Sequence, residues 1–340
     1  MTTMLHRASP VSDDDLASID AAVPGNLWRW GFSEAARARL LNHSENTTYR
    51  IDEGDRRCIL RVHRVGYHTP QAIATELEWL AAIDRDTDIP IAMPIPGANG
   101  GFIQPFDTRQ GVQRYAVLFE FLDGEEPNES HDLPVSFQQL GAITAQLHAH
   151  SREWPHDGRR LLRPVWDFEH TLGANPIWGD YRHGTGVTPA IADHIGQGAA
   201  RLRRRLERYG AGPERFGLIH ADLRLANLLL TQDGRVGVID FDDCGYGWFM
   251  YDLGSALSFI EHKLYVPELI EAWVRGYESV RALADADLDM LSSFVLLRRI
   301  VLLGWLGSHR ETELARQIGQ DYAPQTCELV SRYLFAESVF

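Results

Sequence analysis

The stretch "GLIHADLRLANLLL", residues 217–230, carries three hydrogen-bonding side chains between two apolar runs. His220 and Asp222 follow the first run, and Asn227 precedes the second. The chain then reads as strand, turn and strand through "LLLTQDGRVGVID", which ends at Asp240. A hairpin of this kind places Asn227 and Asp240 side by side at its open end. The sequence therefore predicts that polar residues terminate strands that are otherwise buried.

These side chains have the chemistry of a phosphoryl-transfer site. A carboxylate held in a loop can accept a proton from a hydroxyl group, which makes Asp222 a candidate base. The oxygens of Asn227 and Asp240 are hard ligands that suit Mg²⁺ better than zinc. Protein kinases hold their base and two magnesium ions in the same way. The alternative is that Asp222 and Asn227 only cap turns. We expect His220 to be a buried histidine that braces the loop.

Composition limits the classes of function. The 340 residues carry a formal net charge of −14, which argues against a nucleic-acid partner because phosphate backbones require a basic face. The three cysteines are far apart and form no disulfide or metal pattern, which predicts a reducing, cytoplasmic location. The most apolar helical stretch, "FVLLRRIVLLGWLG" from Phe294, is short for a membrane span and contains Arg298 and Arg299, so we interpret it as a core helix.

The order of the predicted elements indicates an α+β protein with two lobes. Strand-like segments with one interrupting helix extend from about Leu40 to Phe121, and largely helical patterns follow from Asp123. We therefore expect an N-terminal extension at 1–34, a smaller antiparallel-sheet lobe with one helix at 35–122, and a larger, mainly helical lobe at 123–340. Ligands commonly bind in clefts between lobes.

Three motifs resemble those of the aminoglycoside phosphotransferase-like kinases, which include homoserine, choline and hydroxylysine kinases and a bacterial stress-response protein kinase. The family's H-G-D-L-H-x-G-N pattern is similar to "HADLRLAN" at 220–227. Its I-D-[FW]-[DE] pattern is similar to "IDFDD" at 239–243, and its D-L-[AG] to "YDLG", which contains Asp252. The resemblance implies a bilobal, protein-kinase-like fold with ATP in the cleft, Asp222 as base, and Asn227 and Asp240 on magnesium.

The chain departs from this family pattern at several positions. Ala221 and Ala226 stand in place of two glycines, and Leu225 stands in place of a common proline. Arg224 replaces a frequent histidine and lies two residues after the candidate base. An arginine there can grip the transferred phosphate through its planar fork. Two interpretations of Arg224 stay open, a catalytic contact and a solvent-facing side chain.

A kinase also needs a cation on a strand to grip the α- and β-phosphates, paired to a glutamate on the following helix. Lys263, the only lysine, is far along the chain, so "ILRVHR" offers Arg61 for this role. On the helix predicted in "TPQAIATELEWLAAI", Glu76 falls within the apolar face, whereas Glu78 points away. A carboxylate inside an apolar stripe needs a cationic partner. We predict an Arg61–Glu76 pair; the alternative is that Glu76 reaches water.

Two further nucleotide contacts are expected to use backbone groups. A glycine-rich phosphate loop is absent, and the corresponding turn is "NHSENTTY" at 42–49, where Ser44, Asn46 and Thr47 could cradle phosphate oxygens. The same residues suit an ordinary hairpin turn. At the joint between the two lobes, Glu120, Phe121 and Leu122 are candidates to present backbone groups to the adenine edge.

The acceptor site is expected between 163 and 186, a segment rich in Trp, Asp and Arg that could instead be a plain surface insertion. The candidates to contact the acceptor are Trp166, Asp167, Trp178, Asp180 and Arg182. Two acids that follow the metal ligand, Asp242 and Asp243, could hold an ammonium group, extend the metal shell, or bond to neighbouring amides.

The sequence thus favours an ATP- and Mg²⁺-dependent kinase that phosphorylates a hydroxyl of a small molecule, such as an amino alcohol or hydroxy amino acid. Asp222 would orient and deprotonate the hydroxyl while magnesium and Arg61 neutralise the phosphates. Two alternatives remain: a protein serine/threonine kinase, and a nucleotide-binding module without catalysis. No nucleic-acid or membrane partner is expected.

Overall fold

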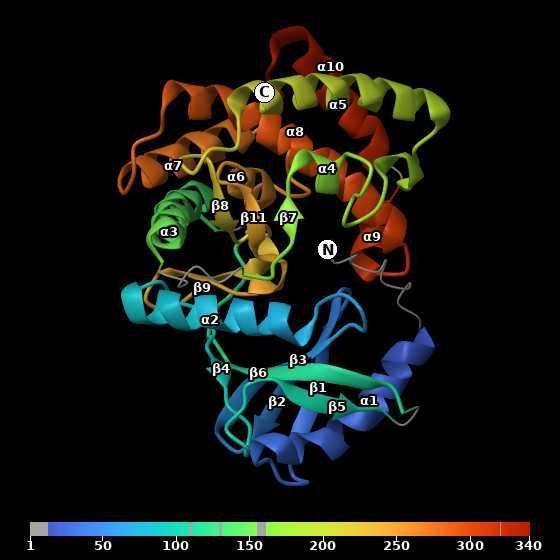
Figure 1. The fold of residues 1–340 in the computed structure, drawn as a ribbon, viewed down its shortest axis with the longest axis vertical. Coiled ribbons are helices and arrows are strands. Elements are labelled where there is room, and N and C mark those ends of the chain that lie inside the picture. The colour runs from blue at the N-terminus through green and yellow to red at the C-terminus, as the bar shows by residue number, and fades with distance from the viewer. Residues whose placement is uncertain (1–12, 109–110, 129–130, 155–160, 320) are drawn as a thin grey trace. The chain divides into compact units, whose positions relative to one another are not determined.

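The computed structural model describes residues 13–108, 111–128, 131–154, 161–319 and 321–340 (Figure 1). The predicted N-terminal extension therefore lies partly outside the described residues. The chain divides into two compact units. Of the described residues, unit 1 contains those from 13 to 84 and from 91 to 122, and unit 2 contains those from 85 to 90 and from 123 onward.

Unit 1 is built on a six-stranded antiparallel sheet in the order β1-β2-β3-β6-β4, with β5 also paired to β6. Its strands are β1 (Arg37–His43), β2 (Asn46–Glu53), β3 (Arg56–His63), β4 (Pro94–Ile95), β5 (Gln104–Asp107) and β6 (Gln113–Glu120). The turn "EGDR" closes a hairpin in which β2 and β3 pair from Asn46↔His63 to Glu53↔Arg56. Gly54 allows this tight turn with a φ of +58°.

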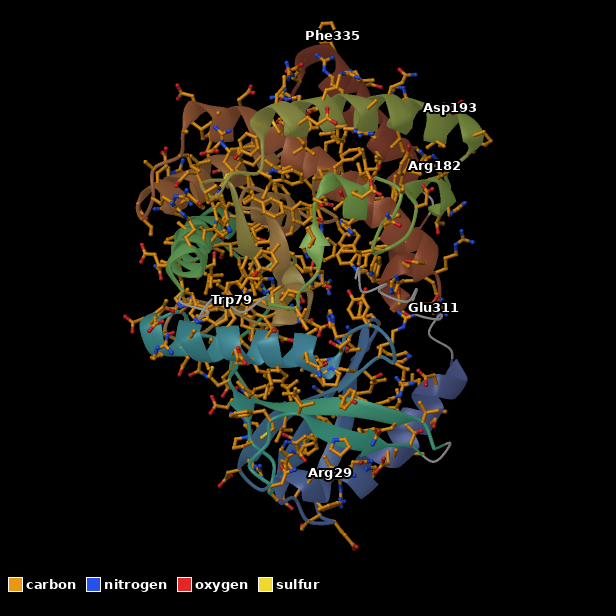
Figure 2. All side chains as sticks on the ribbon, viewed as in Figure 1. Arg29, Trp79, Arg182, Asp193, Glu311 and Phe335 are labelled. Atoms are coloured by element: carbon orange, nitrogen blue, oxygen red, sulfur yellow. The ribbon has the colours of Figure 1, made fainter. Side chains whose placement is uncertain are left out.

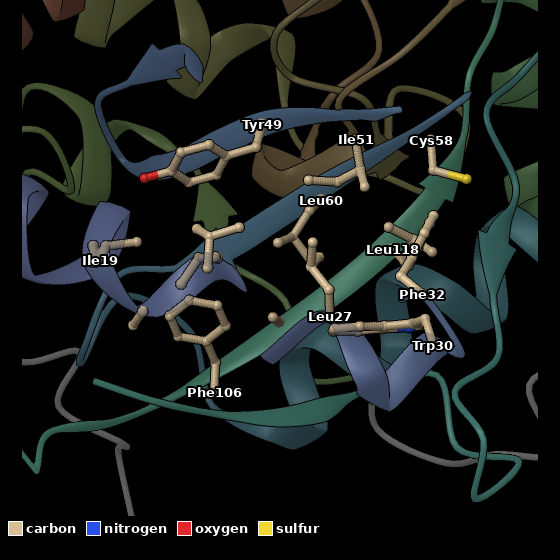
Figure 3. Close-up of a cluster of buried hydrophobic side chains, with 14 residues drawn as sticks. Ile19, Leu27, Trp30, Phe32, Tyr49, Ile51, Cys58, Leu60, Phe106 and Leu118 are labelled. Atoms are coloured by element: carbon tan, nitrogen blue, oxygen red, sulfur yellow. The ribbon is translucent and has the colours of Figure 1, made fainter. Parts of the chain in front are cut away.

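One face of this sheet is covered by a helix that the sequence did not predict. Helix α1 (Asp13–Asn26) and the short η1 (Leu27–Trp30) supply buried apolar side chains to the core of unit 1 (Figure 3). Tyr49 of β2 and Leu60 of β3 belong to the same cluster. The described part of the expected extension is therefore integral to unit 1.

The predicted helix of unit 1 is present as α2 (Pro70–Asp86). The residues Thr69 and Pro70 explain where the helix begins. The hydroxyl of Thr69 accepts a hydrogen bond from the amide of Ala72 at 3.2 Å, and Pro70 occupies the first turn. Trp79, labelled in Figure 2, is fully buried on this helix. Glu76 lies on the buried face, and Glu78 is exposed.

Unit 2 is mainly helical and contains two small sheets, β7-β11-β8 and β9-β10. Figure 1 shows the long helices α5 and α10 running beside α8. Its helices are α3 (Leu133–Glu153), α4 (Phe168–Thr171), α5 (Pro189–Tyr209), α6 (Tyr251–Ala256), α7 (Val266–Glu278), α8 (Asp285–Ser308), α9 (Glu313–Ile318) and α10 (Tyr322–Ala336). Its strands are β7 (Val165–Trp166), β8 (Phe216–Ile219), β9 (Leu228–Leu230), β10 (Val236–Val238) and β11 (Gly245–Trp248). Its short helical turns are η2 (Tyr181–His183), η3 (Leu225–Asn227) and η4 (Phe241–Asp243).

Helix α8 is the core helix that the sequence predicted, but it is longer than the apolar stretch suggested. Among the described residues it is the one helix whose length and composition could cross a membrane, and 89% of its apolar window is buried inside the structure. Arg298 and Arg299 lie in the middle of this helix and are also buried. Burial of two consecutive arginines requires polar partners for both.

Candidate active site

The predicted hairpin forms and joins two of the candidate site residues. Strands β9 and β10 pair from Leu228↔Val238 to Leu230↔Val236. Beyond the last pair, the amide of Ile239 donates to the carbonyl of Asn227 at 3.0 Å. Asn227 therefore lies beside the residue that immediately precedes Asp240. Asp240 has a φ of +62°, in a region that aspartate tolerates better than most residues.

The loop after β8 is fixed by a buried carboxylate from helix α6. Asp252 accepts hydrogen bonds from the amide of His220 at 3.2 Å and from the amide of Ala221 at 2.7 Å. His148 of α3 also contacts Asp252, with 3.1 Å between Nε2 and Oδ2. Burial lowers the pKa of His148 although Asp252 opposes the shift, so the ring is neutral and donates from Nε2. The loop is thus anchored to two helices.

His220 braces this loop, as the sequence predicted. Its Nδ1 accepts the amide hydrogen of Asp222 at 3.2 Å, which leaves the ring proton on Nε2. That nitrogen lies 3.2 Å from the carbonyl of Ile239. One imidazole therefore ties the loop that carries Asp222 to the segment that carries Asp240.

Ala221 stands at a position where glycine fits the backbone better. Its φ is +68°, a conformation that costs an L-residue roughly 1–2 kcal/mol. We expect Ala221→Gly to change the free energy of unfolding by less than about 1 kcal/mol, because relief of strain offsets the flexibility of glycine in the unfolded chain. Ala221→Val should lower it by about 2 kcal/mol or more, since a branched side chain fits this region poorly. Urea unfolding of both variants checks this, and equal tolerance of both would contradict it.

Asp222 lies at the centre of a hydrogen-bonded group. Its Oδ2 accepts from Nδ2 of Asn227 at 2.7 Å and from Nε of Arg224 at 3.2 Å, and its Oδ1 accepts from Nη2 of Arg298. Burial favours the neutral acid, but the charges of Arg298 and Arg224 outweigh burial and hold the pKa of Asp222 below its usual value. Asp222 is therefore an ionised acceptor.

Arg298 is the site residue that the sequence analysis missed. It comes from the middle of α8, and only 1% of its side chain is exposed. Besides Asp222, its guanidinium donates to Oγ of Ser258 at 2.9 Å and to the carbonyl of Ala221 at 3.2 Å. It also lies 4.7 Å from the ring centroid of Trp178. A buried arginine inside an apolar run was the available signal, but the sequence alone did not reveal its partner.

The donor set fits a divalent metal ion. The amide nitrogen of Asn227 is held by the carbonyl and the carboxylate of Asp222, at 2.8 and 2.7 Å. In this orientation the Asn227 side chain offers its carbonyl oxygen, which, like the carboxylate of Asp240, is a hard oxygen ligand. Among the described residues there is no group of three or more His, Cys, Asp or Glu that could hold a metal. An ion here would complete its coordination with phosphate oxygens and water, which is usual for Mg²⁺.

Known proteins are similar to this chain over most of its length. Residues 37–287 match the model of the phosphotransferase enzyme family. The chain belongs to this family. A solved structure of a microcompartment-associated aminopropanol kinase is 44% identical, with 94% of this chain and 99% of that chain covered and a TM-score of 0.86. This likeness confirms the α+β, kinase-like fold predicted from the sequence.

Two amicoumacin kinases are more distant relatives of this phosphotransferase. The enzyme of Bacillus subtilis (strain 168) is 25% identical over 82% of each chain. The structure of amicoumacin kinase hAmiN, in complex with AMP-PNP, Ca²⁺ and Ami, is 21% identical with a TM-score of 0.77. It covers 96% of this chain and 97% of that chain, and at this identity it shows a shared fold.

The two acids that follow Asp240 in the phosphotransferase lie on the short turn η4. Their carbonyls are held by buried residues, because Arg163 donates to the carbonyl of Asp242 and Trp166 donates to the carbonyl of Asp243 at 2.9 Å. Asp242 is 3% exposed, and Asp243 is partly exposed. Of the two, Asp243 is the better placed to meet a ligand from solvent.

The segment 163–186 is packed into unit 2 and is not a plain surface insertion. Trp166 and Trp178 are buried and meet edge-on with 5.0 Å between their ring centroids. Asp167 caps α4, accepting from the amide of His170 at 2.9 Å. Trp166 and Asp167 therefore have structural roles. Trp178 lies against Arg298, which contacts Asp222.

Asp180 and Arg182 have a local explanation that needs no acceptor. Asp180 caps η2 by accepting from the amide of Arg182 at 2.9 Å, and it pairs with the Arg182 guanidinium at 2.9 Å. Arg182 lies at the surface with 55% of its side chain exposed (Figure 2). Their contact with an acceptor stays a prediction.

In unit 1, the predicted pair of Arg61 and Glu76 is present. Nη2 of Arg61 lies 2.6 Å from Oε1 of Glu76, and the side chains are 6% and 0% exposed. Arg61 also lies 4.8 Å from the ring centroid of Phe119. Side chains alternate between the two faces of β3, so Leu60 points into the core and Arg61 points to the opposite face. This direction allows Arg61 to contact Glu76.

Removal of Glu76 should destabilise the phosphotransferase. Glu76→Ala leaves the buried guanidinium of Arg61 without its carboxylate, and we expect a loss of about 3–5 kcal/mol in the free energy of unfolding. The matched control is Glu78→Ala on the exposed side of the same helix, where we expect a change within about 0.5 kcal/mol. Urea unfolding measures both, and similar losses would contradict the expected contribution of the buried pair to stability.

The predicted phosphate turn is tighter than expected. Strands β1 and β2 bring His43 opposite Thr47, so Asn46 and Thr47 belong to β2 rather than to a loop. Both are buried, and the Thr47 hydroxyl contacts Nδ1 of His43 at 2.9 Å. Ser44 stays in the turn, where its amide donates to the carbonyl of Asn46 at 2.9 Å. A phosphate contact therefore stays a prediction mainly for Ser44 at the tip of the turn.

The expected adenine-facing residues lie at the end of β6. The amide of Glu120 already donates to the carbonyl of Met93 at 2.8 Å. The ring of Phe121 is flanked by Arg50 at 5.0 Å and Arg57 at 4.9 Å. Backbone contacts to adenine therefore stay predictions, mainly for Phe121 and Leu122.

Proposed function

We propose that the protein is an ATP- and Mg²⁺-dependent kinase that transfers the γ-phosphate to the hydroxyl of a short amino alcohol of the aminopropanol type. The observation that carries this proposal is the likeness to the aminopropanol kinase, which extends over nearly the whole of both chains. Family membership supplies the reaction class. The ionised, buried Asp222 supports the hydroxyl as the acceptor group.

In this proposal Asp222 orients the acceptor hydroxyl and takes its proton while the hydroxyl oxygen bonds to the γ-phosphorus and the bond from that phosphorus to the departing ADP oxygen breaks. Because Asp222 is held in place, proton transfer takes place within one complex of protein and acceptor. Such positioning of a reactive group can account for a large part of the rate acceleration. Arg224 is one-quarter exposed and contacts Oδ2 of Asp222. Its guanidinium can turn to the transferred phosphate, which leaves Oδ2 for the hydroxyl.

Asn227 and Asp240 are the residues that would hold a divalent ion. A bound ion would neutralise charge on the phosphate oxygens. The complex of amicoumacin kinase hAmiN with AMP-PNP and Ca²⁺ supports the use of a nucleotide and a divalent ion in this family. We assign Arg61, held by Glu76, to the nucleotide phosphates. Unlike a lysine, this guanidinium cannot lose its charge at any physiological pH.

We assign the ammonium group of the acceptor to Asp243, which is more exposed than Asp242. A carboxylate at this point would favour a cationic amino alcohol over a neutral alcohol of the same shape. The protein-acceptor and non-catalytic alternatives have no comparable support, because the aminopropanol kinase and the amicoumacin kinase of Bacillus subtilis are named as kinases of small molecules.

The test is ADP release from Mg-ATP with 1-amino-2-propanol, ethanolamine, choline, homoserine and 2-propanol as acceptors. We expect turnover with the short amino alcohols and much less with 2-propanol, which lacks the ammonium group. Mass spectrometry of the product locates the phosphate on oxygen. Turnover of homoserine alone would show that the acceptor is a hydroxy amino acid and not a short amino alcohol. Nucleotide binding without turnover of any acceptor would favour the non-catalytic module. Labelling of the protein itself by [γ-³²P]ATP would favour the protein kinase.

A further inference from the structure

We propose that Arg298 is a positioning residue that aims the carboxylate of Asp222 at the acceptor hydroxyl. This inference rests on the proposed function, in which Asp222 is the base. It adds a residue from α8, far from the motifs in sequence, whose effect on the reaction is exerted through Asp222.

The contacts of Asp222 hold its carboxylate group in one orientation. Arg298 holds Oδ1, while Asn227 and Arg224 contact Oδ2 at 2.7 and 3.2 Å. A carboxylate can rotate about its last bond, and contacts to both oxygens prevent that rotation. When Arg224 turns to the phosphate, Arg298 and Asn227 are left to hold the plane of the carboxylate. Without Arg298, that plane would be held from one side only.

Arg298 is itself held on several sides, which makes it a rigid support. Ser258, Ala221 and Tyr251 accept from its nitrogens at 2.9, 3.2 and 3.5 Å, the last being a marginal contact. The Trp178 ring stacks near the guanidinium. The bond to the Ala221 carbonyl fixes the peptide immediately before Asp222, so one guanidinium sets both the backbone and the side chain of the base. Such support is what a precise active site requires.

The neighbouring Arg299 provides a matched control. Consecutive helix residues point about 100° apart, so the two arginines meet different partners. Arg299 pairs with Glu261 at 2.8 Å and contacts Thr326 at 2.9 Å, with neither side chain of the ion pair exposed. Both arginines are therefore buried, charged and paired with an acid, but Arg298 is the one that contacts Asp222. A purely structural role would make the two variants equivalent.

The experiment compares Arg298→Ala, Arg298→Lys and Arg299→Ala by steady-state kinetics with Mg-ATP and 1-amino-2-propanol. Assays are run at a temperature where circular dichroism shows each variant to be folded. For Arg298→Ala we expect kcat to fall about 100-fold, the scale of a misplaced reactive group, with little change in the KM for ATP. Arg298→Lys keeps the charge without the fork and should be intermediate. Added guanidinium, below denaturing concentrations, should restore part of kcat in Arg298→Ala.

Arg299→Ala should lose thermal stability but keep kcat, without a response to guanidinium. Equal kcat values for the folded Arg298→Ala and Arg299→Ala proteins would overturn the proposal. If the wild type does not phosphorylate 1-amino-2-propanol, the proposed acceptor is wrong. Crystal structures of the two alanine variants then test the positioning separately. A rotated Asp222 carboxylate in Arg298→Ala alone supports the proposal, and an unmoved carboxylate contradicts it.

Discussion

Replacement of Asp222 by asparagine is expected to lower kcat by about 10²–10⁴-fold, the range that a general base contributes. The amide keeps the size of the side chain but cannot accept the proton of the acceptor hydroxyl. Asp222 is assigned to the acceptor hydroxyl and not to the nucleotide, so ATP binding should be affected much less than turnover. ADP release with saturating 1-amino-2-propanol measures the change, and ATP binding by calorimetry measures what remains.

The control for this substitution is Asp233→Asn in the turn of the β9–β10 hairpin. Asp233 is an exposed acid that pairs with Arg235 at 2.7 Å on the same hairpin. Its loss should leave kcat unchanged. Asp222→Asn also removes the carboxylate that forms an ion pair with the buried Arg298, so the thermal stability of the variant must be measured beside its activity. A folded Asp222→Asn protein with wild-type turnover would remove Asp222 from its role.

Asp240→Asn is expected to produce the second large effect, a fall in kcat/KM of about 10²–10³-fold. Charge stabilisation by a bound metal is worth several kcal/mol, and each 1.36 kcal/mol corresponds to about tenfold in rate. Asparagine tolerates the positive φ of Asp240, so the substitution removes charge with little backbone strain. The Mg²⁺ concentration for half-maximal activity should rise in the variant. Chelation by EDTA should abolish activity of the wild type.

Titration of kcat/KM against Mg²⁺ distinguishes loss of the metal site from general damage. If Asp240 holds the ion, high Mg²⁺ recovers part of the lost activity. An unchanged Mg²⁺ requirement in a folded Asp240→Asn protein would contradict the assignment.

The sequence was sufficient where local pattern and chemistry coincide. The β9–β10 hairpin followed from two short apolar runs around Asp233-Gly234, and its formation brings Asn227 next to Ile239. The pairing of Arg61 followed from Glu76 lying in the apolar stripe of α2. In both cases the partners are close along the chain or are selected by strand and helix periodicity, so few alternatives had to be considered.

Partners that are distant in sequence could not be chosen in this way. Two arginines in the apolar run of α8 signalled buried acids, but many carboxylates were available. The choice of Asp222 for Arg298 and of Glu261 for Arg299 depends on how α8 packs in three dimensions. Helix α1 was missed because its apolar residues bury against a sheet, and its own sequence contains an internal Pro24 and weak periodicity. Trp178 was singled out, but its neighbour Arg298 was not.

The most direct test of the central claim is the position of a divalent ion in crystals grown with Mn²⁺ and a non-hydrolysable ATP analogue. The account predicts an anomalous peak at coordinating distance from the side-chain oxygens of Asn227 and Asp240, with Asp222 facing the γ-phosphate. Bound nucleotide with its ion away from both residues would contradict it.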